Sequence, residues 1–132
     1  MFGVRADALV SAIDRTMSRV EFDLDGTITD ANPAFLNLVG YSLGEVRGRH
    51  HSLFVSEAER AKPDYATFWA RLGAGHHEAR EFARVTKSGQ IIWIRGSYNP
   101  ILDRRGKVVK VVKFATDVTE ERARNALFAG QI

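Results

Sequence analysis

The strongest constraint on the fold is a change of hydrophobic period near Gly75. Before this glycine, apolar residues recur mostly at helical spacing, and after it they alternate as they do in strands. Three segments are therefore predicted to be strands, 77–86, 90–102 and 107–118, with turns at Ser88-Gly89 and Arg105-Gly106 between them. Such strands form an antiparallel meander, which must bury one face against another part of the chain.

A second pair of strands is expected near the N-terminus. Residues 19–24, Arg-Val-Glu-Phe-Asp-Leu, alternate strictly between polar and apolar, which is typical of a half-buried strand. Asp25-Gly26 supplies a tight turn, because glycine adopts a positive φ at little cost, and residues 19–30 then form a hairpin. A hairpin alone is only marginally stable. It is therefore predicted to join the later strands in one five-stranded antiparallel sheet, which gives an α+β fold.

Helices are expected between the two groups of strands and at both ends of the chain. Residues 5–16 carry apolar side chains at helical spacing, and the acids that begin segment 119–129 suit a helix N-terminus. The other predicted segments are a helix from Asn32-Pro33 to Gly40, a short helix that Ser42 and Glu45 cap and that ends at Gly48, a helix or irregular segment over 49–55, and a longer helix from Pro63 to residues 73–75. The helices between the strands are expected to cover one face of the sheet.

Composition narrows the class of protein. The 132 residues suit one domain that buries a core without cross-links, and the absence of cysteine excludes disulfides, thiolate chemistry and cysteine-rich zinc sites. No apolar run approaches the roughly 18 residues of a membrane span, so a soluble segment is expected, and the absence of cysteine fits a cytoplasmic location. The net charge of +3 comes from 19 basic and 16 acidic residues, which indicates a mixed-charge surface rather than nucleic-acid binding.

Motifs for catalysis are absent from the sequence. Gly106-Lys107 lacks both the earlier glycine and the following serine or threonine of a phosphate-binding loop. Neither a Gly-x-Ser-x-Gly nor a His-Glu-x-x-His pattern occurs. Asp23 and Asp25 lie close together, but at a predicted turn they are more simply acceptors for turn amides. The chain is therefore expected not to be an enzyme.

The order of the elements and several short motifs resemble the PAS fold. The motifs are Asp25-Gly26-Thr27-Ile28 with Ala31-Asn32-Pro33-Ala34-Phe35, Gly40-Tyr41-Ser42 with Glu45-Val46-Arg47-Gly48, Lys87-Ser88-Gly89, Asn99-Pro100-Ile101-Leu102-Asp103 with Gly106, and Asp117-Val118-Thr119. The resemblance implies a sensory, signal-transducing domain. It divides the chain into an N-terminal flanking helix over 1–17, a PAS sensor domain over 18–119, and a C-terminal signalling helix or linker over 120–132.

Other segments resemble the PAS domains of soluble bacterial methyl-accepting chemotaxis receptors, including aerotaxis-like ones. These segments are 48–54 (GRHHSLF), 68–72 (FWARL), 97–101 (SYNPI) and 110–119 (KVVKFATDVT), and 128–132 resembles the linker that leads into a second such domain. The resemblance implies a homodimer. It also implies a second PAS domain and a methyl-accepting signalling domain in the full-length chain.

The same resemblance implies candidate cofactors between the sheet and the short helices. Aerotaxis receptors bind FAD, and by similarity His51 would lie beside the flavin and Trp69 near its ring or the adenine. The redox state of FAD would then be the signal. The sequence differs from that pattern after Gly75, where His76-His77 stand in place of a proline and a tryptophan.

Haem is the alternative cofactor, because a neutral imidazole is a good axial ligand. His50 and His51 point in different directions if their segment is helical, so at most one would ligate the iron, and His51 is preferred as this metal ligand. A light-sensing LOV function is not expected, because His51 replaces the photoreactive cysteine of that group. The other interpretation is a PAS domain that binds another small molecule, or none, and serves dimerisation and relay.

Strand alternation assigns the residues of 90–102 to two faces. If Ile94 and Tyr98 face the pocket, Trp93 faces the other side, where PAS sheets often pack on a flanking helix or a second protomer. Ile94 and Tyr98 are therefore candidate cofactor-binding residues, and Trp93 is a candidate interface residue. Asp117 and Thr119 belong to the motif that joins the sheet to the last helix, so they are the candidate relay residues.

Overall fold

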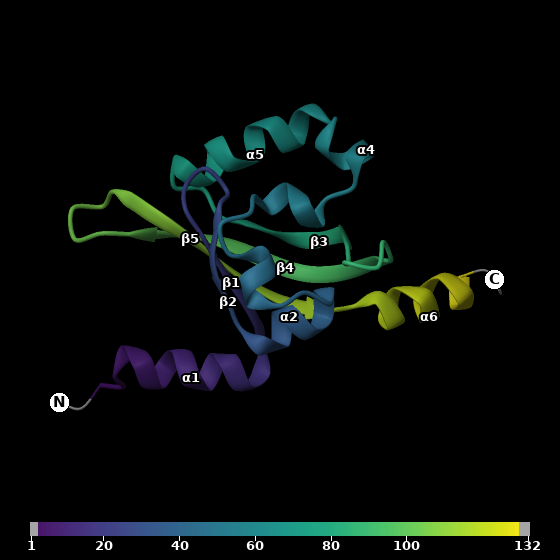
Figure 1. Cartoon of the computed structure of the whole chain (residues 1–132), viewed down its shortest axis with the longest axis horizontal. Helices are drawn as coiled ribbons and strands as arrows, with labels where there is room; N and C mark the ends of the chain where they lie inside the picture. The colour runs from purple at the N-terminus through teal and green to yellow at the C-terminus, as the bar shows by residue number, and fades with distance from the viewer. Residues whose placement is uncertain (1–2, 130–132) are drawn as a thin grey trace.

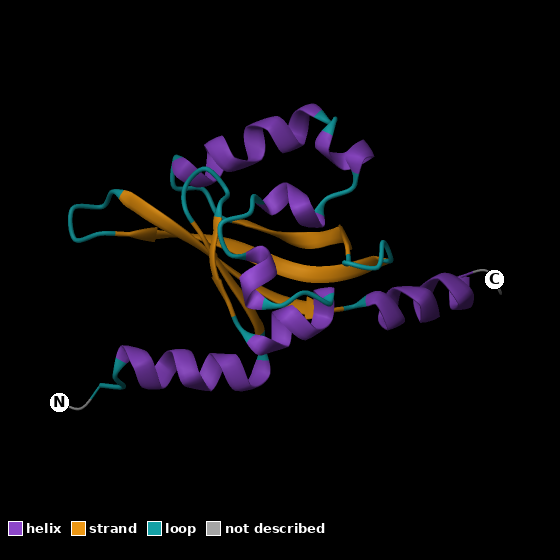
Figure 2. Cartoon of the chain, in the orientation of Figure 1, coloured by secondary structure: helices purple, strands orange, loops and turns teal. Residues whose placement is uncertain are grey.

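The computed structural model describes residues 3–129, and Figures 1 and 2 show the arrangement of their elements. The elements are α1 (Ala6–Thr16), β1 (Ser18–Phe22), β2 (Ile28–Ala31), α2 (Pro33–Val39), α3 (Leu43–Val46), the 3-10 helix η1 (His51–Phe54), α4 (Glu57–Arg60), α5 (Pro63–Gly73), β3 (Glu78–Val85), β4 (Ile91–Leu102), β5 (Val108–Asp117) and α6 (Thr119–Ala129). The predicted flanking segments extend to residues 1–2 and 130–132, which lie outside the described residues.

One antiparallel sheet contains all five strands, in the order β2-β1-β5-β4-β3. The N-terminal hairpin therefore joins the C-terminal meander through its first strand, because β1 pairs with β5. This pairing places the first and last strands of the chain side by side, with β5 at the centre of the sheet. The predicted α+β class and the predicted five-stranded sheet are both confirmed.

Local backbone signals produce the expected turns and caps. The turn of the first hairpin is closed by a hydrogen bond from the Gly26 N–H to the Asp23 carbonyl (3.0 Å), and Gly26 has a φ of +91°. The Asn32 side chain accepts from the Phe35 N–H at 3.0 Å, which caps α2, and Gly40 ends that helix. These interactions join residues that are close in the chain, so the sequence predicts them well.

The segment between residues 49 and 62 is more helical than expected. Residues 51–54 form η1, and the unpredicted helix α4 follows it. The N-cap of α4 is Ser56, whose side chain accepts from the Glu59 N–H at 3.2 Å. Ser56 and Glu59 have the same spacing as Ser42 and Glu45, so the signal for this helix was present in the sequence.

The hydrophobic core lies on one face of the sheet, under η1, α2, α3 and α5. Its larger buried members are Phe22, Ile28, Phe35, Phe54, Phe68, Trp69, Leu72, Phe82, Ile94 and Tyr98. Helices α1 and α6 lead away from the sheet toward the two termini (Figure 1), and neither helix contains a buried residue. Within residues 3–129, no helix combines the length and the apolar character that crossing a membrane requires.

Candidate functional site

A buried histidine lies at the centre of the inner face of the sheet. His51 belongs to η1 and has no solvent exposure. Its Nε2 atom lies 2.8 Å from the Tyr98 hydroxyl of β4, and its Nδ1 atom lies 3.1 Å from the Tyr65 hydroxyl of α5. Both ring nitrogens therefore have a hydrogen-bond partner, and the imidazole links a helix to the sheet.

Several aromatic rings pack around this histidine. We call the set the inner aromatic cluster; its members are Phe22, His51, Phe54, Tyr65, Phe68, Trp69, Phe82 and Tyr98. The ring centroids of His51 and Trp69 are 5.3 Å apart, and those of Phe68 and Tyr98 are 4.9 Å apart, both in edge-to-face geometry. Burial in this apolar setting lowers the pKa of His51 well below its usual value, and the charges of Arg84 and Lys113 act in the same direction.

Two buried cations flank Tyr98. The Arg84 Nη2 atom of β3 donates to the Tyr98 hydroxyl at 3.0 Å, and Lys113 is the cross-strand partner of Tyr98 on β5. The Lys113 Nζ atom lies 4.8 Å from the centroid of the Tyr98 ring. Arg84 is 6% exposed and Lys113 is 1% exposed, whereas none of the aspartates and glutamates within 3–129 is buried. The interior of the domain therefore carries positive charge without an acidic partner.

Burial and the neighbouring positive charges shift the pKa values of both Lys113 and Tyr98. Desolvation by burial lowers the pKa of Lys113 to about 8, because water no longer solvates the ammonium group. Burial alone would raise the pKa of Tyr98, but the positive charges of Arg84 and Lys113 together outweigh it, and the net shift is downward. Tyr98 is therefore the group in this site whose negative form the surroundings stabilise.

The structure brings together four of the residues that the sequence marked for cofactor binding. His51, Trp69, Ile94 and Tyr98 are all buried in the same core. His50 lies apart from them and is exposed: its Nδ1 atom accepts from the Ser52 N–H at 3.0 Å. Its Nε2 atom therefore carries the proton and donates to the Asp25 carbonyl at 2.8 Å. Both nitrogens of His50 thus hold backbone in place.

The candidate cofactor-binding residues predicted above did not include Arg84, Tyr65 or Lys113. A usable signal existed for Arg84, since it follows Phe82 by two residues and must share its face of β3. The same argument applies to Lys113, which stands between the buried Val111 and Ala115 on β5. A cation at an inward-facing strand position is unusual enough to indicate a site.

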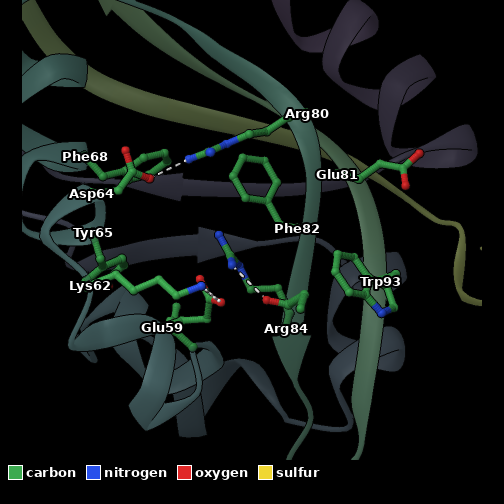
Figure 3. Close-up of a pocket in the computed structure, with 12 residues that line it drawn as sticks. Glu59, Lys62, Asp64, Tyr65, Phe68, Arg80, Glu81, Phe82, Arg84 and Trp93 are labelled. Carbon is green, nitrogen blue, oxygen red and sulfur yellow. Dashed lines mark hydrogen bonds and ion pairs between the residues drawn. The ribbon is translucent and has the colours of Figure 1, made fainter.

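A cavity of about 220 Å³ opens beside the edge strand β3. Figure 3 shows Arg84 extending from β3 into the space between Tyr65 and Phe82. Two ion pairs lie at the rim: Lys62 with Glu59 at 2.8 Å, and Arg80 with Asp64 at 3.0 Å. The cavity therefore connects the surface of the domain with the Arg84 guanidinium, and through it with the inner aromatic cluster.

Trp93 anchors the start of α6 to the sheet. The Trp93 N–H donates to the Thr119 Oγ1 atom at 2.8 Å, and the Trp93 carbonyl accepts from the Val118 N–H at 2.8 Å. The Arg122 guanidinium of α6 lies 3.7 Å from the centroid of the Trp93 ring. Asp117 accepts from the Thr119 N–H at 2.9 Å, which fixes the chain where it leaves β5. As alternation predicts, Trp93 is on the outer face, where it packs on the flanking helix of its own chain.

Comparison with known proteins supports a single family. A family model described as PAS fold matches residues 9–123. The biofilm dispersion protein BdlA of Pseudomonas aeruginosa is 44% identical over 109 residues, which cover 83% of this chain and 26% of that protein. The aerotaxis receptor of Escherichia coli is 30% identical over 99 residues, which cover 75% of this chain and 19% of the receptor. The chain thus spans about a quarter or less of these two relatives.

Solved structures agree with this assignment. A light-oxygen-voltage domain studied with a flavin analogue superposes with a TM-score of 0.74 at 25% identity, and the match covers 93% of each chain. The single five-stranded antiparallel sheet and the helices over its inner face agree with the predicted PAS fold, and the family model matches most of the chain. The chain therefore belongs to the PAS fold family, and its relatives include the aerotaxis-type sensors that the sequence motifs resemble.

Proposed function

We propose that this domain is a non-catalytic sensory module of a bacterial chemoreceptor-type protein. Its input acts at the inner aromatic cluster, and its output leaves through α6. The observation that carries the proposal is that one strand, β4, serves both regions. Tyr98 points from β4 into the cluster, and Trp93 holds the start of α6 on the opposite face of the same strand. A displacement of β4 by a bound group therefore moves the attachment point of α6.

The relay needs two arrangements of the α6 joint. A bound group shifts their balance only by the difference in its affinity for the two arrangements. The joint consists of a few local contacts: the Thr119 and Val118 bonds to Trp93, the stacking of Arg122, and the ion pair from Arg122 to Glu81 at 2.7 Å. Because α6 has no buried residue of its own, these contacts determine where it begins.

FAD is the first candidate for the bound group. The relatives supporting it are an aerotaxis receptor and a light-oxygen-voltage domain studied with a flavin analogue. His51, Trp69 and Tyr98 offer flat aromatic surfaces, and the buried Trp69 Nε1 has no hydrogen-bond partner. FAD would supply redox chemistry. The 220 Å³ cavity is smaller than the roughly 300–1,000 Å³ of typical ligand pockets, so accommodating a flavin ring requires α5 to move away from the sheet.

The residues do not fit haem as they stand. Both nitrogens of His51 are bonded to tyrosine hydroxyls inside a closed aromatic cluster, so neither is free to ligate iron. Both nitrogens of His50 hold backbone groups near the surface. Axial ligation would require either histidine to give up such a bond. FAD remains the first candidate because binding it, unlike haem, does not require a histidine to ligate a metal.

An absorption spectrum of the purified protein, taken before and after dithionite, tests the cofactor. We expect flavin bands that bleach on reduction, either as purified or after FAD is added back. Trp69→Leu is expected to weaken FAD binding at least tenfold, because aromatic stacking on the ring is lost. Phe128→Leu is the control, since this exposed aromatic residue of α6 does not line the cavity. A Soret band would contradict the preference for FAD, and a spectrum unchanged by added FAD and haemin would contradict both cofactors.

The α6 joint provides a test of the relay. Thr119→Val removes the acceptor of the Trp93 N–H, and we expect a loss of about 1 kcal/mol of stability together with faster amide exchange at the start of α6. Asp117→Ala removes the acceptor of the Thr119 N–H. In the full-length receptor, both variants should lose output while ligand content stays unchanged. Thr116→Val, at an exposed position on β5, is the control. Normal signalling by both joint variants would contradict the relay.

The proposed function extends to the full-length protein that would contain this domain. We propose that the sensor domain over residues 18–119 works as a homodimer in the cytoplasm, with an N-terminal flanking segment over 1–17 and a C-terminal signalling helix or linker over 120–132. A second PAS domain and a methyl-accepting signalling domain would follow in the full-length chain. The further domains are supported by the coverage of the relatives: the chain spans only 26% of one relative and 19% of another, which leaves most of their length for other domains.

A further inference from the structure

Arg84 is a buried guanidinium with unused hydrogen-bonding capacity. Its Nη1 atom donates to the Ala83 carbonyl at 2.9 Å and its Nη2 atom to the Tyr98 hydroxyl at 3.0 Å, but its buried Nε atom has no partner. An arginine carries five N–H donors in a planar fork that matches a carboxylate. We propose that the cavity beside β3 is a binding site for a small organic carboxylate, with Arg84 as its anchor.

The other charges of the cavity do not compete for this role. Lys62 is paired with Glu59 at the rim, and Arg80 is paired with Asp64. The remaining lining acid, Glu81, pairs with Arg95 and Arg122 on the far side of β3. In the described part of the chain, Arg84 is the one cation lining the cavity that has no carboxylate within 4 Å. The rim is thus close to neutral, and the positive charge lies at the inner end.

A bound carboxylate would supply the missing negative charge. Burying a cation without a counter-ion is costly, and a bidentate carboxylate is the partner that a guanidinium prefers. Lys113 is buried behind Tyr98 and adds to the positive potential at the same place. The hydroxyl of Tyr65, at the cavity wall, offers a further hydrogen bond beside its contact with His51. Three separate features therefore point to an anion.

The walls of the cavity indicate an organic anion of limited size. Phe68 and Phe82 line it, and such apolar rings favour a ligand with a carbon body over phosphate or sulfate, whose whole surface is polar. A volume of about 220 Å³ corresponds to the space of roughly seven waters at about 30 Å³ each. It therefore suits a carboxylic acid of a few carbon atoms.

This site would also reach the sensory region described above. A carboxylate on Arg84 competes with Tyr98 for the same guanidinium, and Tyr98 in turn contacts His51. The inference rests on the proposed function only in one respect, which is that carboxylate binding would act as an input signal of the sensory domain. Binding itself requires neither FAD nor haem. Because a flavin would occupy the same cavity, the titration uses protein without bound flavin, and its result is obtained separately from the optical test.

Calorimetric titration and thermal unfolding at constant ionic strength test the site. The probes are acetate, butyrate and succinate, with inorganic phosphate and sulfate for comparison. We expect at least one carboxylate to bind with a Kd of about 1 mM or tighter and to raise the unfolding midpoint. Arg84→Gln should weaken this binding at least tenfold, because it removes the charge and the fork. Lys107→Gln, which removes an exposed cation in the last hairpin turn away from the cavity, should leave binding within about twofold.

Additional measurements keep the test decisive if Arg84→Gln does not fold. Tyr65→Phe retains the ring and should weaken carboxylate binding several-fold. In the wild type, the Nε–H resonance of Arg84 should shift during the titration with butyrate or succinate. Absence of carboxylate binding up to about 10 mM would overturn the proposal. Unchanged affinity in folded Arg84→Gln, or equally tight binding of phosphate and sulfate, would overturn it as well.

Discussion

Gly26→Ala is expected to destabilise the domain by about 2 to 4 kcal/mol, because strain and overpacking combine at this position. Gly26 has a φ of +91°, and a Cβ atom there would lie 2.7 Å from the Nε2 atom of His50 and 2.9 Å from the Cε2 atom of Trp69. His50 cannot retreat freely, since its two nitrogens hold Asp25 and Ser52. The added methyl group therefore has to push the hairpin turn away from Trp69.

Gly106→Ala is the matched control for this substitution. Gly106 has a similar φ of +82° in another hairpin turn, but nothing lies within 4 Å of a Cβ atom built there. It should cost only the backbone strain, about 1 kcal/mol. Urea unfolding of both variants measures the difference, and Trp69 fluorescence should change only in Gly26→Ala. Equal destabilisation by the two substitutions would show that the contact of Gly26 with Trp69 and His50 is unimportant.

Lys113→Met is expected to stabilise the domain at pH 7 by about 1 to 3 kcal/mol. Burial lowers the pKa of Lys113 from 10.5 to about 8. A shift of that size corresponds to about 3 kcal/mol of cost in keeping the buried amine protonated. Its contacts with the rings of Tyr98 and Phe35 return part of this, up to about 2 kcal/mol. Methionine has a similar shape, fills the same space and needs no charge solvation.

The stabilisation should depend on pH in a defined direction. Between the folded and unfolded pKa values of Lys113, the unfolded chain binds more protons, so the stability of the wild type rises as pH increases through this window. The lowered pKa of Tyr98 acts in the same direction. The advantage of Lys113→Met should therefore shrink by about 2 kcal/mol between pH 7 and pH 9.5.

Denaturant unfolding at both pH values, compared with Lys107→Met, checks this prediction. Lys107 is exposed in the last hairpin turn, so its replacement should change stability by less than about 0.5 kcal/mol at either pH. A destabilised Lys113→Met at pH 7 would mean that the ammonium group is a net contributor to folding. In that case Tyr98 would be its negatively charged partner in the folded state.

Much of the architecture could be predicted from the sequence, because local signals specify it. Gly26 specifies the first turn, Asn32 caps α2, and the Ser42–Glu45 capping box starts α3. Each of these interactions joins residues within a few positions of one another. The alternation of residues along β4 likewise predicted that Tyr98 and Trp93 lie on opposite faces. The missed helix α4 had its own local signal at Ser56, so that error was not imposed by tertiary structure.

The chemistry of the site was decided by tertiary structure. The Tyr98 hydroxyl meets His51 across 47 residues of chain and Arg84 across 14, and the Trp93 N–H meets Thr119 across 26. Sequence alone determined the strands, the turns, most of the helices and the family, because periodicity and caps act over short distances. Packing of η1 and α5 on the sheet decided that His51 has two tyrosine partners. It also decided that two cations share one buried site without an acid, because such contacts depend on how distant segments pack together.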